Sequence, residues 1–133
     1  MIMAYKEKLK KELHLISVDE RLKCYLLTKK VWLMFWEENI QKNNMEEILH
    51  KIETSFSEKQ LISRKTIIIM GNTIDEFHPS DLVWFNGMNM YVVFYLINEK
   101  NSKTYRCSNF FDSIGWGYRK WIKKIDFILS GKA

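Results

Sequence analysis

The sequence has no apolar run longer than about eight residues, whereas roughly 20 are needed for a helix that crosses a bilayer. We therefore expect no membrane-spanning segment and no membrane partner. Charged residues begin at Lys6, before the apolar core of a signal peptide could form. The sequence thus favours a cytoplasmic protein.

Cysteine, proline and histidine are all scarce. Cys24 and Cys107 stand in no CxxC motif and in no metal-ligand spacing, so we expect two reduced thiols in or near the core. The single proline, Pro79, follows His78 in an expected loop. Because none of the three histidines has the spacing of a metal ligand, the sequence predicts no metal site and no cofactor.

Catalytic motifs are also missing. The chain has no phosphate-binding loop of the GK[ST] type and no GxSxG nucleophile elbow, and Gly115-Trp-Gly117 lacks the third glycine of a dinucleotide site. Carboxylates and an imidazole come together between Asp75 and His78, where Glu76 is the second acidic residue. An enzyme with its site in that loop is one alternative. We favour a surface turn, and a protein that is not an enzyme.

The composition is that of an ordinary folded domain. Of 133 residues, 47% are apolar, 28% are charged and 14% are aromatic, which predicts one domain over residues 1–133 with a single core.

Apolar spacing in the first half indicates helices. The first is expected over 2–16, with Ile2, Leu9 and Leu13 on its inner face. A second is expected from a capping box at 17–20 through the apolar run 31–36 to residue 42, with a short buried strand at 31–36 as the competing interpretation.

A third helix should follow Asn44 and carry Met45, Ile48 and Ile52 on its inner face as far as Phe56.

The second half is expected to be mainly a sheet. The β-branched run 66–70 should be a strand closed by a turn at Gly71-Asn72, and 82–85 should form a hairpin with the strand 90–98. A further strand is expected at 104–108, followed by an amphipathic helix that Asp112 or Ser113 would cap and Gly131 would end. The predicted class is α+β, with about three N-terminal helices, a small and mostly antiparallel sheet of three to four strands, and a C-terminal amphipathic helix.

The net charge of +5 is distributed unevenly. Residues 1–98 hold 13 basic and 13 acidic residues, whereas residues 99–133 hold eight basic and three acidic ones. Between Thr66 and Asn98 the charged residues are all acidic. An acidic loop region therefore precedes a basic tail, which indicates a polar binding surface.

The last helix has the sharper pattern. One indole and four cations recur at i, i+3, i+4, i+7 and i+8, which places them on one outward stripe: Trp116, Arg119, Lys120, Lys123 and Lys124. Such a stripe suits phosphate contacts and base stacking, and it suits an acidic protein surface equally well. It is also typical of a helix that is simply kept in solution.

We expect a non-enzymatic binding protein that recognises another protein. The contact surface is either the basic helix or the acidic loop with Asp75 and Glu76. A nucleic-acid-binding module that uses the basic helix is the second alternative, although the chain has no helix-turn-helix or RNP signature. In general style the chain resembles the dedicated immunity or antitoxin inhibitors that neutralise bacterial toxins by covering their active sites. That comparison rests on the type of protein and on no residue motif.

Overall fold

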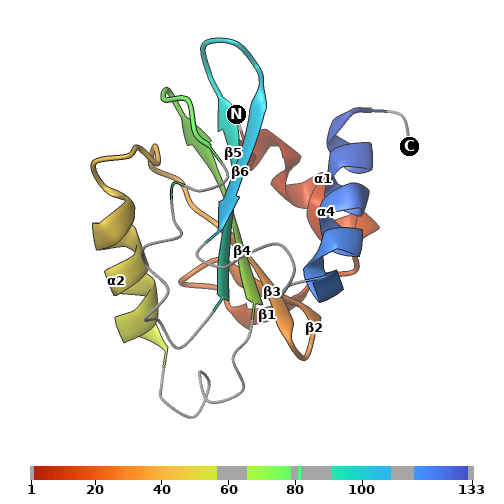
Figure 1. Ribbon diagram of the computed structural model, residues 1–133. Coiled ribbons are helices and arrows are strands. Elements are labelled where there is room, and N and C mark those ends of the chain that lie inside the picture. Colours follow the sequence, from red (N-terminus) through yellow and green to blue (C-terminus); the bar gives the residue numbers. More distant parts are fainter. Residues whose placement is uncertain (1, 57–65, 79–80, 82–90, 109–115, 132–133) are drawn as a thin grey trace.

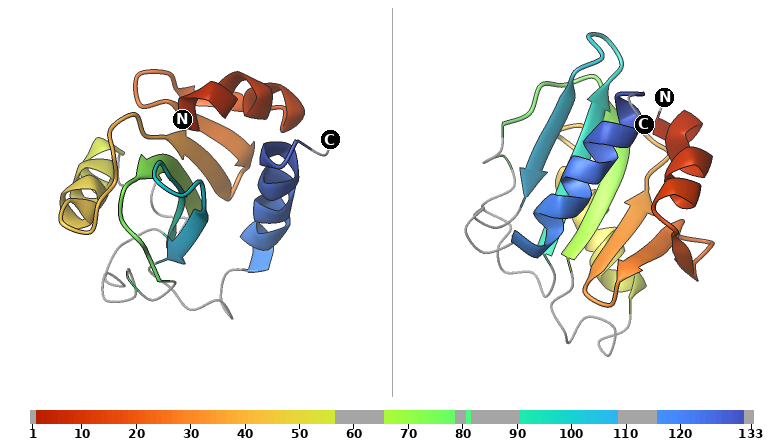
Figure 2. Two further views of the ribbon diagram at one scale, coloured as in Figure 1. Left: turned by 90° about the horizontal axis from the view of Figure 1, so that it is seen from above. Right: turned by 90° about the vertical axis from the view of Figure 1, so that its right-hand side faces the viewer.

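A six-stranded mixed sheet lies between two layers of helix in the computed structural model of the chain (Figure 1). The structure describes residues 2–56, 66–78, 81, 91–108 and 116–131. Helix α2 covers one face of the sheet, and helices α1 and α4 lie on the other (Figures 1 and 2). The elements follow one another as η1 (a 3₁₀ turn, Ile2–Tyr5), α1 (Lys6–Glu12), β1 (Ile16–Asp19), β2 (Cys24–Thr28), β3 (Val31–Phe35), α2 (Met45–Ser55), β4 (Thr66–Thr73), β5 (Tyr91–Asn98), β6 (Thr104–Ser108) and α4 (Trp116–Leu129).

The order of strands in the sheet is the order of strands in the chain. Strands β1, β2 and β3 form an antiparallel meander, β3, β4 and β5 are parallel, and β6 returns antiparallel to β5. Each parallel pair needs a crossover connection. Helix α2 lies within the first crossover, and the second spans residues 74–90.

Strict alternation in strands β4 and β5 builds two cores. In β4, Ile67 and Ile69 face α2, whereas Ile68 and Met70 face α1 and α4. Strand β5 divides its side chains in the same way, and all of its residues except the first are buried. Burial on both faces is typical of strands in the middle of a helix-covered sheet, and it explains why these runs are apolar throughout.

The predicted helical segment over 17–42 is wrong. The chain forms β1, β2 and β3 there, and all five residues of β3 are buried, so the apolar run is a central strand instead of an enclosed helix. The expected capping box at 17–20 lies mostly in β1 and leads into the turn of a hairpin, where the Asp19 carboxylate accepts hydrogen bonds from the backbone N–H groups of Arg21 (2.9 Å) and Leu22 (3.2 Å). Ile16, placed on the first helix by its spacing, lies in β1 and is 64% exposed.

The predicted sheet is also wrong in size and direction. It has six strands, of which three are mutually parallel, and not three to four mostly antiparallel ones. The neighbour of β5 on one side is β4, and not the expected strand 82–85, which lies outside the described residues together with its turn. Gly71 and Asn72 do not turn the chain, because β4 continues through them to Thr73.

Other predicted elements are confirmed. Helix α1 follows the predicted first helix as far as Glu12, and α2 follows Asn44 with Met45, Ile48, Leu49 and Ile52 buried. Strands β5 and β6 and the final helix α4 lie where the sequence places them. The caps expected at 112 and 113 are outside the described residues.

Candidate binding surface

Helix α4 has a buried face that fixes its orientation on the sheet. Tyr118, Ile122, Ile125 and Ile128 are each at most 6% exposed, and they pack against the β4 and β5 side chains of the same core. The helix ends at Leu129, and Gly131 follows in the turn, where its φ of +73° is easily adopted by glycine and its N–H donates to the Ile128 carbonyl oxygen.

Two polar contacts also hold α4 in place. The buried Tyr95 hydroxyl in β5 donates a 2.5 Å hydrogen bond to Asp126 Oδ1. Burial raises the pKa of Tyr95, and the hydrogen bond to Asp126 raises it further, so the phenol keeps its proton at neutral pH. From α1, Lys8 Nζ donates to the Ile128 carbonyl oxygen at 3.3 Å, a favourable place for a cation near a helix C-terminus.

The outward face of α4 carries the expected cations. Arg119, Lys120, Lys123 and Lys124 are all exposed. The side chain of Trp116 lies outside the described part of the chain, so its place on the stripe stays a prediction. Both Lys120 and Lys124 lie over the Trp121 ring, with Nζ at 5.2 and 4.7 Å from its centroid. These contacts hold two of the charges close to the helix surface.

Phe127 extends the same face towards the C-terminal end of α4, and the stripe predicted from the sequence did not include it. It is 53% exposed and is the one exposed aromatic side chain among the described residues. It follows Lys123 by four residues, Lys124 by three and Lys120 by seven, so it shares their side of the helix. This spacing could have revealed Phe127 from the sequence, but the predicted stripe stopped at Lys124.

A hollow lies beside Phe127, between the last turn of α1 and the second half of α4. Its volume is about 330 Å³, and its lining residues are Glu12, Leu13, Lys123, Lys124, Phe127 and Ile128. Leu13 and Ile128 are nearly buried and form an apolar floor, while the two lysines and Glu12 are exposed around it. The basic face of α4 is therefore continuous with an apolar depression.

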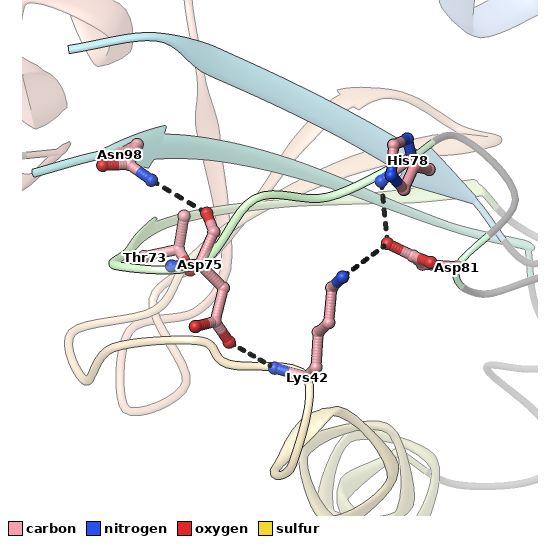
Figure 3. A network of polar contacts seen from close by, with 6 residues as sticks. All are labelled: Lys42, Thr73, Asp75, His78, Asp81 and Asn98. Carbon is pink, nitrogen blue, oxygen red and sulfur yellow. Dashed lines mark hydrogen bonds and ion pairs between the residues drawn. The ribbon is translucent and has the colours of Figure 1, made fainter. Parts of the chain in front are cut away.

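The polar groups of the acidic loop after β4 are engaged in contacts within the fold (Figure 3). The Asp75 carboxylate accepts a 3.0 Å hydrogen bond from the Lys42 backbone N–H, and the Asp75 carbonyl oxygen accepts one of 2.8 Å from the buried amide of Asn98. The His78 backbone N–H donates to Asp81 Oδ2 at 2.7 Å, and Lys42 Nζ lies 3.8 Å from the same oxygen. These groups hold the loop to the segment that leads into α2.

The loop does not bring its carboxylates and its imidazole to one point. Figure 3 shows the Asp75 side chain directed towards the backbone of Lys42, with His78 on the far side of the Lys42 side chain beside Asp81. Glu76 and His78 are exposed. This arrangement favours the structural turn over a catalytic site. It also puts Asp75 beside the α2 layer, whereas the α4 cations belong to the opposite layer.

The two cysteines are buried and free, as expected. Burial raises the pKa of each thiol to about 12, and the charge of Asp19 adds to the effect at Cys24, as that of Asp81 does at Cys107. Neither thiol has the lowered pKa of a nucleophile.

The described residues contain neither a candidate metal centre nor a candidate membrane span. Among them, no group of three or more His, Cys, Asp or Glu side chains is placed to hold a metal ion. None of the helices that the structure describes is long and apolar enough to cross a membrane.

Comparison of the chain with protein-family models, with curated proteins and with solved structures gave no match.

Proposed function

We propose that this chain is a small, non-enzymatic binding protein that recognises another protein through the outward face of α4. The observation that carries the proposal is the position of Phe127, a half-exposed ring among four exposed cations on one helix face. Aromatic anchors and arginine are enriched where protein interfaces concentrate their binding energy, and surrounding charges steer the partner and fix its register.

The face is supported by a rigid base. The buried Ile side chains of α4, the Tyr95–Asp126 hydrogen bond and the Lys8 contact all fix the helix before a partner arrives. A preformed surface loses less conformational entropy on binding, so more of the contact energy remains as affinity. The acidic loop is the weaker candidate, because the Asp75 carboxylate is already engaged within the fold.

The mode of action that we propose is inhibition by covering a partner's functional surface, in the manner of immunity and antitoxin proteins that neutralise toxins. The basic face requires that the covered surface of the target be acidic. The complex would be tight and of 1:1 stoichiometry.

Purification of the tagged chain from its native cells tests the proposal. We expect one stoichiometric protein partner with the wild type, and its loss with Lys120→Glu plus Lys123→Glu. The matched control is Lys29→Glu plus Lys30→Glu, which makes the same charge change on exposed residues between β2 and β3 and should retain the partner. Circular dichroism would verify that both variants fold. Absence of any stoichiometric protein partner would contradict the proposal.

Nucleic-acid binding through the same face is the second candidate, because exposed lysines around an aromatic ring also suit phosphate contacts and base stacking. It predicts an affinity for DNA or RNA that falls steeply with salt, since each phosphate contact releases counterions. A salt-dependent nucleic-acid affinity that Lys120→Glu plus Lys123→Glu abolishes would replace the protein partner as the function.

A further inference from the structure

The hollow between α1 and α4 has the features of a socket for one side chain of a partner. Its floor is apolar, formed by Leu13 and Ile128, and Phe127 forms an exposed wall. Its volume of about 330 Å³ is at the small end of ligand pockets. One large apolar side chain from a partner would occupy part of it and cover its apolar floor.

The charges around the hollow indicate which residues of the partner would flank the inserted side chain. Lys123 and Lys124 lie on its α4 side, and Lys120 is one helical turn before Lys124, about 6 Å along the axis. Carboxylates that flank an inserted apolar residue would meet these ammonium groups.

A polyanion with a continuous phosphate backbone fits the hollow less well. Glu12 places a carboxylate on the opposite side, from α1, and the side chains of the floor, Leu13 and Ile128, are apolar. A protein segment can place its acidic groups next to the lysines and leave an apolar side chain between them. Charge complementarity thus favours an acidic protein segment over a nucleic acid as the occupant of the hollow.

We infer that the α1–α4 hollow binds an acidic segment of the partner protein that carries a single aliphatic or aromatic anchor, with the anchor beside Phe127 and the flanking carboxylates on Lys123 and Lys124. The inference rests on the proposed protein-binding function and specifies which part of the face recognises which chemistry.

Selection of peptides from a random displayed library on the immobilised full chain tests it. We expect enrichment of sequences in which glutamate or aspartate flanks one large apolar residue. A synthetic peptide with the enriched sequence should bind the wild type, and Phe127→Ala should weaken it about tenfold, the usual effect of removing an aromatic anchor. Phe127→Leu keeps an apolar wall and should retain most of the affinity.

Amide shift mapping by NMR with the same peptide shows where on the chain the peptide binds. The shifts should cluster on the end of α1 and the second half of α4. Enrichment of basic peptides, binding unchanged by Phe127→Ala, shifts on another surface, or a preference for duplex DNA or anionic vesicles over the peptide would each overturn the inference.

The inference and the proposed function fail in distinguishable ways. If the native partner is captured and Lys120→Glu plus Lys123→Glu releases it, but Phe127→Ala does not weaken it, the protein-binding function stands and the socket is wrong. If no native partner is captured, the protein-binding function itself is wrong.

Discussion

Tyr95 joins the sheet to its last helix through a single hydroxyl group. Removing that group in Tyr95→Phe leaves the ring in place but breaks the 2.5 Å bond to Asp126. We expect a loss of about 1 to 2 kcal/mol in the free energy of unfolding, because the bond is partly buried and its acceptor is charged. Urea denaturation measures this loss in the free energy of unfolding.

Tyr105→Phe is the matched control, because the bond that its hydroxyl accepts from Asn101 is exposed and 3.3 Å long. It should change stability by no more than about 0.5 kcal/mol. Equal losses in the two variants would contradict the role assigned to Tyr95.

Gly71 makes room for a neighbouring side chain. A Cβ at this position would lie 2.7 Å from Ile40 Cδ1, and Ile40 is fully buried. We expect Gly71→Ala to destabilise the fold by about 1 to 2 kcal/mol through overpacking. Ile40→Val removes the atom in conflict, so thermal or urea unfolding of the double variant should show a smaller loss than the sum of the two single ones. Strict additivity would exclude the steric explanation.

At the scale of elements, Asn98 connects the end of β5 to two loops. Its side-chain amide donates to the Asp75 carbonyl oxygen, and its Oδ1 accepts from the backbone N–H of Lys100 at 2.8 Å. Asn98 itself is 1% exposed, and Asn98→Ala removes the partners of the Asp75 carbonyl oxygen and the Lys100 N–H in two partly buried hydrogen bonds, so it should cost about 2 kcal/mol. Faster hydrogen exchange at Lys100 would accompany the loss.

The exposed Asn101 offers a comparison at the same turn, where its Oδ1 accepts from the Lys103 N–H. Asn101→Ala should cost under about 1 kcal/mol, because water can replace the lost contact. A cost as large as that of Asn98→Ala would refute the importance of burial here.

Elements with one buried face could be predicted from the sequence. Helix α2 was predicted because Met45, Ile48 and Ile52 recur at helical spacing above a polar outer face. Strand β3 has no polar face, since its side chains are buried in both cores, and an apolar run of five has no period that separates strand from helix. The tertiary environment decides that this run is a strand, whereas the sequence alone favoured a helix.

At the scale of the whole molecule, buried thiols make the fold sensitive to alkali. The pKa values of Cys24 and Cys107 rise from 9.0 to about 12 on folding, so above pH 9 the unfolded chain releases these protons first. Stability should therefore be insensitive to these groups below about pH 8 and fall as pH rises from about 9 towards 12. By pH 10 we expect a loss of about 1 kcal/mol for each thiol.

Urea denaturation at a series of pH values measures this dependence. The variant with Cys24→Ala and Cys107→Ala should give a flatter profile over the same range, although its stability at neutral pH is lower. A wild-type profile that is flat up to pH 10, or one that the two substitutions leave unchanged, would contradict it.

The candidate surface was partly predictable, because Lys120, Lys123 and Lys124 follow from helical periodicity alone. The exposure of Phe127 and the hollow beside it were not, because they depend on where α1 lies against α4. The parallel direction of β3, β4 and β5 was equally inaccessible, since it is set by the paths of crossovers and not by the residues of the strands.

The strand order has a consequence for biosynthesis. Each new strand can pair with one already made, so the sheet can extend as the chain is synthesised. Helix α4 is the last described element, and its Ile side chains complete the core over β4 and β5. Its outer side carries the proposed partner site. A nascent chain that stops before α4 therefore lacks both the core cover and the site, so on this proposal synthesis must pass α4 before the chain can engage the partner.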